Sequence, residues 1–138
     1  MKTLPQVTDV IPHRKPFLFL SDISECSKIH AVGHHRFENE AFFKGHFPAD
    51  PIVPGVILIE GLAQTLAYLA LCQVPDGLVM LTGVEKCKVR ASVRPGDRVT
   101  YTINVDRSKL RMVIASGTVS VDDKHVLSAQ IKGFIGSK

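Results

Sequence analysis

Residues 42–71 read FFKGHFPADPIVPGVILIEGLAQTLAYLAL, and this stretch decides the fold. A Gly-His-Phe-Pro turn is followed by a Pro-Gly pair and then by a long apolar segment, in which Glu60 is the single charged side chain from Val56 to Cys72. A helix without a polar face has to be buried, because no side of it suits water. Such a helix would be about 26 Å long, slightly short for a bilayer span, and prolines flank it. We therefore predict a core helix rather than a membrane helix.

The carboxylate in this apolar segment needs an explanation. Glu60 and Gln64 are four residues apart, so they share one face of the predicted helix. A carboxylate in such a helix is costly unless it is paired or used in chemistry. In a purely structural reading, neighbours at a subunit contact satisfy Glu60, and His46 is a turn histidine held by hydrogen bonds. The presence of both favours chemistry, because a His that meets a buried Glu moves protons near neutral pH.

The Pro54–Gly55 pair adds a third element of this chemistry. It places the backbone N–H groups of Gly55 and Val56 at the start of the predicted helix, where no helical partner is available to them. The partial positive charge of a helix N-terminus can hold a developing oxyanion. A base, an acid and an oxyanion donor in one short stretch indicate abstraction of a proton next to a carbonyl group.

The segment GHFPADPIVPGVILIEGLAQ resembles the signature GHFPGxPxxPGVLxxEAMAQ of the (3R)-hydroxyacyl-[acyl-carrier-protein] dehydratases of the FabZ type. The spacing between His46 and Glu60 matches. The other matching positions are Pro51, Pro54, Gly55, Ala63 and Gln64. The resemblance extends upstream to 11–18 and downstream to 94–97, and it covers nearly the whole chain. The chain departs from the pattern at Ser21, where Asp is usual, and at Gly61-Leu62, where Ala-Met is usual, so the preferred acyl length is left open.

The resemblance implies an α+β protein with the hotdog fold, in which a curled antiparallel sheet wraps around one long central helix, with residues 1–138 forming a single domain. It implies dehydration of a (3R)-hydroxyacyl-[acyl-carrier protein] to the trans-2-enoyl product, in fatty acid synthesis or a related acyl or polyketide route. His46 would be the general base and Glu60 the general acid, in surroundings that favour its protonated form. Substrate-binding roles are implied for Gly55, Val56 and Gln64.

The resemblance also implies how the site is assembled. His46 and Glu60 of one site would come from different protomers of a homodimer, and three dimers could associate further. No metal is implied, and no cofactor beyond the phosphopantetheine arm that the substrate carries. The partner would be an acyl carrier protein, which is acidic. His13 matches the family pattern but has no evident chemical task, so we expect it to be structural.

A basic face is predicted after the core helix. One set of alternating residues is apolar, namely Cys87, Val89, Ala91 and Val93, and the other is polar and mostly basic, namely Lys86, Lys88, Arg90, Ser92 and Arg94. The alternation predicts a strand with one buried and one solvated face. The basic residues Lys86, Lys88, Arg90 and Arg94 could receive an acidic carrier protein, although a simply solvated strand face is an equally good reading.

The remaining pattern predicts a short helix at 8–10 and strands at 17–23, 29–37, 78–84, 99–105, 113–121 and 126–135. The absence of Trp, the two Tyr residues and the lack of a Lys/Arg run argue against nucleic acid as a partner, whereas the modest net charge of +4 could favour an acidic partner. Three widely spaced cysteines and the absence of an apolar N-terminal signal core predict a cytoplasmic protein without disulfides. Two rival functions are an acyl thioesterase of the same fold and a non-catalytic acyl-binding subunit.

Overall fold

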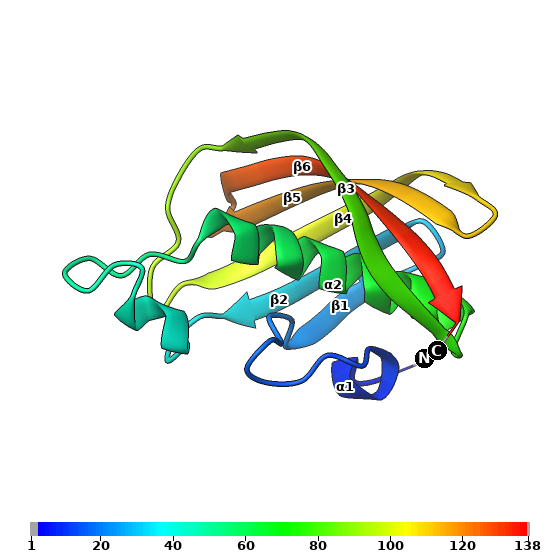
Figure 1. Cartoon of the computed structure of the whole chain (residues 1–138), viewed down its shortest axis with the longest axis horizontal. Coiled ribbons are helices and arrows are strands. Elements are labelled where there is room, and N and C mark those ends of the chain that lie inside the picture. The colour runs from blue at the N-terminus through cyan, green and yellow to red at the C-terminus, as the bar shows by residue number, and fades with distance from the viewer. Residues whose placement is uncertain (1–2, 138) are drawn as a thin grey trace.

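The computed structural model describes residues 3–137. The elements follow in the order α1 (Val7–Val10), β1 (Asp22–Cys26), β2 (His30–Arg36), η1 (Ala41–Lys44), α2 (Gly55–Gln73), β3 (Gly77–Val89), β4 (Arg98–Lys109), β5 (Met112–Val121) and β6 (Lys124–Ser137). All six strands form one sheet in the order β1-β2-β4-β5-β6-β3, and every neighbouring pair is antiparallel. The sheet curls around α2, which crosses its concave face (Figure 1).

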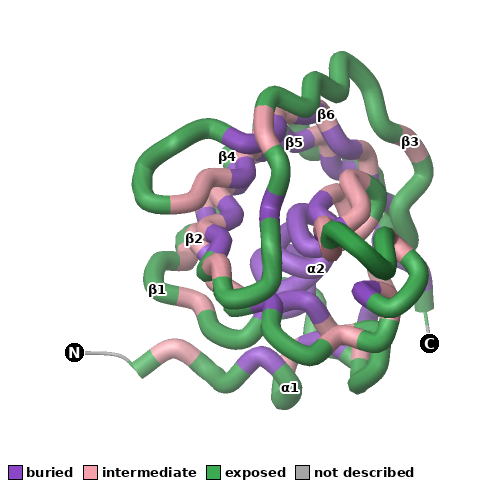
Figure 2. Tube along the Cα trace, turned by 90° about the vertical axis from the view of Figure 1, so that its left-hand side faces the viewer, coloured by how far each residue is buried: buried purple, intermediate pink, exposed green. Residues whose placement is uncertain are grey.

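The core lies between α2 and the inner face of the sheet. Buried residues of α2 are surrounded by buried positions of β2, β4, β5 and β6 (Figure 2). Along β4, Val99, Tyr101 and Ile103 are fully buried while the residues between them are not. The predicted core helix is confirmed. By length and hydropathy α2 could cross a bilayer, but 61% of its apolar window is buried inside the protein, as expected of a core helix.

The strand predicted at 17–23 is largely wrong, because β1 begins only at Asp22. The physical reason lies in α2. The backbone N–H of Phe19 donates to Gln64 Oε1 at 2.8 Å, and the carbonyl oxygen of Phe17 accepts from Gln64 Nε2 at 3.1 Å. A helix side chain therefore satisfies these backbone groups in place of a neighbouring strand.

The strands predicted at 78–84 and 86–94 also need correction. One strand, β3, runs from Gly77 to Val89, and residues from Arg90 to Pro95 are outside the sheet. Cys87 is exposed and the side chain of Val89 is 61% exposed, so the predicted buried face is wrong at these two positions. A bulge between Glu85 and Lys88, with Lys86 at a φ of 53°, interrupts the alternation. In addition, β3 is an edge strand, and its residues after the bulge are exposed to solvent.

Candidate active site

His46 lies in the turn after η1, and its backbone and side chain are both anchored. Its N–H donates to the Phe42 carbonyl oxygen at 2.9 Å, and its own carbonyl oxygen accepts from Ile52 N at 2.9 Å. Its Nδ1 is 2.9 Å from the Ile52 carbonyl oxygen. Because a carbonyl oxygen can only accept, Nδ1 must carry the hydrogen of this bond. The neutral imidazole is therefore held as the tautomer whose Nε2 has a free lone pair, which is the form that a general base needs.

Glu60 is held by Gln64, one turn further along α2. Gln64 Nε2 donates to Glu60 Oε2 at 2.9 Å, and the same amide bonds the backbone of Phe17 and Phe19. Gln64 is completely buried, and these two backbone contacts define which end of its amide is oxygen and which is nitrogen. The N–H groups of the amide can then point only toward acceptors, of which Glu60 is one. Gln64 is expected to orient the Glu60 carboxylate, and this hydrogen bond is of the kind that such a role needs.

His13 is the neighbour of Glu60 that the sequence analysis missed. Its Nε2 lies 3.6 Å from Glu60 Oε2, and the two side chains are only 22% and 19% exposed. Burial lowers the pKa of His13, the Glu60 carboxylate opposes this effect, and the Arg14 guanidinium adds to it. A neutral imidazole is therefore favoured next to Glu60. No periodicity places residue 13 over the helix, because the loop after α1 makes this contact; only its match to the family pattern could have drawn attention to it.

The N-terminus of α2 is open. Its first recorded backbone bonds are those of Ile57 and Leu58 to the Pro54 carbonyl oxygen, and no side chain caps it. Within residues 3–137, the N–H groups of Gly55 and Val56 thus have no recorded partner. Val56 is 71% exposed, and a side chain built on Gly55 would lie 3.8 Å from Val89 at the end of β3. Val56 is thus exposed and Gly55 partly exposed at the start of the helix.

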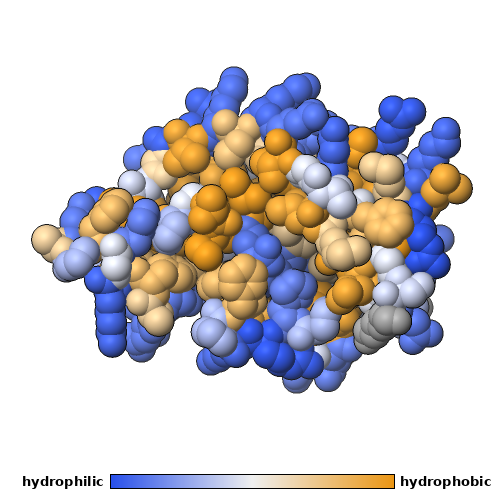
Figure 3. Space-filling model, in the orientation of Figure 1, coloured by the Kyte–Doolittle hydropathy of each residue, from blue (hydrophilic) through white to orange (hydrophobic). Residues whose placement is uncertain are grey.

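Some of the predicted site residues are hydrogen-bonded to one another, and others are not. Glu60 and Gln64 are in direct contact. By contrast, no hydrogen bond or ion pair connects His46 with Glu60 in the part of the chain that the structure describes. Apolar side chains gather over α2 and β3 on the side of the molecule shown in Figure 3. The exposed ones on these elements are Val56, Met80, Leu81, Val84 and Val89.

The predicted basic residues are all exposed, but their surroundings differ. The Arg94 guanidinium pairs with the Asp50 carboxylate, in the loop that leads to α2. For Lys86, Lys88 and Arg90 no ion pair is recorded among residues 3–137. Val89 lies against the start of α2, since a side chain built on Gly55 would be 3.8 Å from it, and Arg90 follows Val89 directly.

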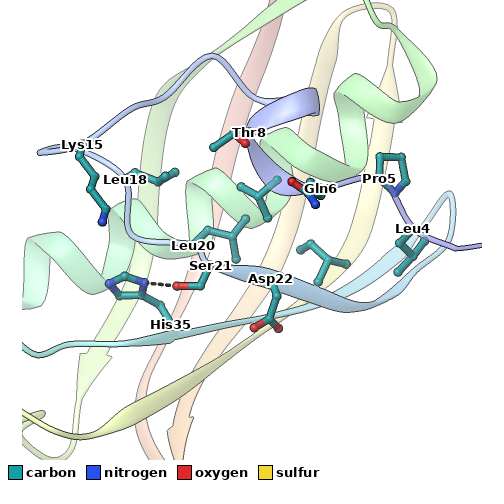
Figure 4. A pocket seen from close by; sticks show the side chains of 12 residues that line it. Leu4, Pro5, Gln6, Thr8, Lys15, Leu18, Leu20, Ser21, Asp22 and His35 are labelled. Carbon is teal, nitrogen blue, oxygen red and sulfur yellow. Dashed lines mark hydrogen bonds between the residues drawn. The ribbon is translucent and has the colours of Figure 1, made fainter.

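Three cavities are found in the described chain. One, of about 640 Å³, is lined by Ile57 and by residues between Lys15 and Phe42, and it contains none of the predicted site residues. A cavity of about 50 Å³ is lined by His13, Glu60 and apolar residues of α2, β3 and β6. A larger one, of about 510 Å³, lies between the N-terminal segment and β1 and contains none of the predicted site residues (Figure 4). At its edge, Ser21 Oγ and His35 Nδ1 are 2.7 Å apart, and His35 Nε2 is 2.9 Å from Glu40 Oε1. This chain of bonds connects the start of β1 to the segment before η1. Only the small cavity among those described is lined by a predicted catalytic residue, Glu60.

A six-stranded antiparallel sheet curled around one long helix defines a hotdog-fold protein. The fold agrees with solved structures: a dehydratase heterocomplex, ApeI:P from Xenorhabdus doucetiae, matches with a TM-score of 0.84 at 17% identity, over 97% of this chain and 93% of that one. A hypothetical thioesterase from Streptococcus pneumoniae matches with a TM-score of 0.66 at 11% identity, over 85% of this chain and 86% of the other. These likenesses establish the fold alone.

Sequence comparison identifies the family. The FabA-like domain model matches residues 11–130. A 3-hydroxyacyl-[acyl-carrier-protein] dehydratase FabZ from Petrotoga mobilis is 35% identical over 131 residues, which cover 93% of this chain and 94% of the relative. The FabZ protein of Thermotoga petrophila is 38% identical over 126 residues, 91% of each chain. The chain belongs to the FabA-like domain family, and its similarity is to the FabZ type.

Proposed function

We propose that this protein dehydrates (3R)-hydroxyacyl thioesters carried by an acyl carrier protein to trans-2-enoyl thioesters, in fatty acid or related acyl synthesis. The observation that carries the proposal is the hydrogen bond from His46 Nδ1 to the Ile52 carbonyl oxygen, because it leaves Nε2 free to act as a base. The N-terminus of α2, which no side chain caps, follows in the same stretch of the chain. The dehydratase relatives support the same reaction.

In the proposed mechanism, His46 Nε2 removes the α-proton of the substrate. The N–H groups of Gly55 and Val56 donate to the thioester oxygen as enolate charge develops on it, with the helix N-terminus adding its partial positive charge. Glu60, in its protonated form, gives a proton to the departing β-hydroxyl group, which leaves as water. Gln64 holds the Glu60 carboxyl group in position. No cofactor takes part beyond the phosphopantetheine arm of the substrate.

The site is shared between two protomers in this proposal. The lack of a hydrogen bond or ion pair between His46 and Glu60 within residues 3–137 supports such sharing. The free edge of β3 offers unpaired backbone groups, and Met80, Leu81 and Val84 expose apolar surface beside it. A second copy that pairs its own β3 with this edge would cover these side chains. It would also bring its His46 toward the Glu60 of the first chain. Three such dimers could assemble further, in the cytoplasm.

The experiment that tests the function follows two products in the same sample. Purified protein is mixed with a (3R)-hydroxyacyl pantetheine thioester, and the absorbance of the conjugated enoyl product is recorded together with free thiol. We expect enoyl formation without thiol release, and a loss of about 10²–10⁴-fold in His46→Ala and in Glu60→Gln. Thiol release without enoyl product would instead establish a thioesterase, and binding without either signal would establish a non-catalytic acyl-binding protein.

The unpaired charges at the end of β3 are proposed to receive the acidic carrier protein. Reversing Lys88 and Arg90 to Glu should raise KM for a carrier-bound substrate about three- to tenfold and leave kcat nearly unchanged, since charges at the rim of an interface act mainly on encounter. A pantetheine thioester without the carrier should show no change. Lys109→Glu, in the hairpin between β4 and β5, is the matched control. An unchanged KM for the carrier-bound substrate in the double variant would refute this docking surface.

A further inference from the structure

Every dehydration leaves the proposed acid without its proton. His46 gains the α-proton, and Glu60 gives a proton to the hydroxyl group that departs as water. The substrate therefore becomes enoyl thioester and water, while the protein holds a protonated His46 and a Glu60 carboxylate. Before the next turnover, Glu60 has to be protonated again. The reaction thus requires a route for a proton to Glu60 that does not pass through the substrate.

Two side chains contact the Glu60 carboxylate within residues 3–137. One is Gln64, whose amide donates a hydrogen bond but does not titrate. The other is His13, with Nε2 at 3.6 Å from Oε2. An imidazole can accept a proton at one ring nitrogen and release one from the other. His13 is therefore the titratable side chain within ion-pair distance of the acid, and Arg14, whose charge is permanent, is the other ionisable group that acts on it. Tyr101 also feels the charge of Glu60, but burial raises its pKa well above the usual value, so it keeps its own proton.

The second nitrogen of His13 is placed for such a relay. His13 Nδ1 is buried and has no hydrogen-bond partner in the described chain. His13 and Glu60 both line the cavity of about 50 Å³, and its remaining walls are apolar. A cavity of this size can hold at least one water molecule, since about 10–15 Å³ is enough for one. A water molecule in this cavity would supply the hydrogen-bond partner that Nδ1 lacks among the protein groups, and it would connect the imidazole to a source of protons.

The backbone around His13 is rigidly held. The Arg14 guanidinium donates to the carbonyl oxygens of Thr8 at 2.9 Å, Ile11 at 2.9 Å and His13 itself at 2.7 Å. Three bonds from one side chain tie the loop to the end of α1. This anchoring keeps the imidazole over α2 although the loop has no regular structure of its own.

We propose that His13 is a positioning and proton-relay residue for the Glu60 acid, which it protonates again after each turnover. This inference rests on the proposed dehydratase function. His13 Nε2–H would deliver a proton to Glu60 Oε2, while Nδ1 takes one from water in the cavity. The hydroxide left behind is neutralised by the proton that His46 releases to solvent, so the protein and the water return to their starting charges. Exchange of the ring hydrogen with water then restores the Nε2–H tautomer for the next cycle. The favoured neutral state of His13 agrees with this role, because a permanent imidazolium would stabilise the Glu60 carboxylate and oppose its use as an acid.

The test separates the first turnover from the following ones. With His13→Ala in excess over substrate, the first dehydration should proceed within about twofold of the wild-type rate, because the relay acts only after Glu60 has given up its proton. Under multiple-turnover conditions kcat should fall about 10–100-fold, the range for losing a group that supports an active-site residue. Added imidazole should restore kcat of His13→Ala and leave the wild type unchanged. His13→Gln, which keeps a polar side chain of similar length but cannot carry a proton, should behave like His13→Ala without rescue.

Two results would overturn the relay. One is an unchanged kcat in both His13 variants. The other is an equal loss in first and later turnovers without rescue by imidazole, which would mean that His13 only shapes the site. Thermal unfolding of each variant identifies any loss of fold, and His13→Gln is the variant expected to keep it. A failure of the dehydratase function itself is distinguishable, because the wild-type protein would then form no enoyl product.

Discussion

Chains with His46→Ala and chains with Glu60→Gln, each inactive alone, should recover about a quarter of the wild-type dehydration rate when they are co-assembled in equal amounts. Random pairing makes half of the dimers mixed, and one of the two sites in a mixed dimer then has both residues intact. The expectation rests on the lack of a hydrogen bond or ion pair between His46 and Glu60 inside the described part of a single chain. Co-expression with two different affinity tags, followed by the enoyl assay, measures the effect.

Mixing the wild type with a double variant is the control for this co-assembly experiment. A chain with both His46→Ala and Glu60→Gln has nothing to contribute to a shared site. Mixed in equal amounts with the wild type, it should lower the activity of the wild-type chains by about half, because every site of a mixed dimer then lacks one residue. Sites formed within one chain would give the opposite pattern: no recovery in the first mixture and no loss in the second.

Gly61→Ala should destabilise the protein by about 1–3 kcal/mol, although alanine is the better helix former. A Cβ built on Gly61 would lie 2.2–2.3 Å from the Cζ, Cε1 and Oη atoms of Tyr101. Tyr101 is fully buried in β4 under α2 and has no room to withdraw. The gain in helix propensity, about 0.5–1 kcal/mol, is smaller than the expected cost of overpacking. Thermal unfolding should show a Tm lower by roughly 5–15 °C.

Two further variants make this prediction specific. Gly83→Ala is the control for a Gly-to-Ala change, because its new methyl group meets only the flexible Lys132 side chain, at 3.3 Å. Tyr101→Leu, combined with Gly61→Ala, removes the ring and should recover part of the lost stability. A Tm for Gly61→Ala at or above that of the wild type would show that helix propensity dominates and that the contact with Tyr101 is not tight.

The hydroxyl group of Tyr101 is also tightly enclosed. Tyr101 Oη is buried without a hydrogen-bond partner in the described chain. Burial raises the pKa of Tyr101 well above its usual value, so the group stays neutral, but its missing bond still costs free energy. The small residue at position 61 thus accommodates a bulky side chain on β4. The departure from the family pattern at Gly61 therefore has a packing reason in this chain.

The secondary-structure elements with strong local patterns can be predicted from the sequence alone. The core helix follows from an apolar run with one charge, and β4, β5 and β6 follow from clean alternation between turn residues. The pairing of Glu60 with Gln64 follows from a spacing of four residues, since helix geometry alone brings such positions together. The turn, the helix start and the carboxylate also identified the family, because these motifs lie in one continuous stretch.

Three features depend on residues that are distant in the sequence, and they are seen only in the folded protein. The segment at 17–21 has strand-like residues, yet the Gln64 side chain takes the hydrogen bonds of Phe17 and Phe19. Cys87 and Val89 alternate with charges, yet a bulge and the edge position of β3 leave them exposed. His13 reaches Glu60 across 47 residues of chain, through a loop that Arg14 anchors. Periodicity reports which face of an element is apolar, but it carries no information about which loop or side chain will cover that face.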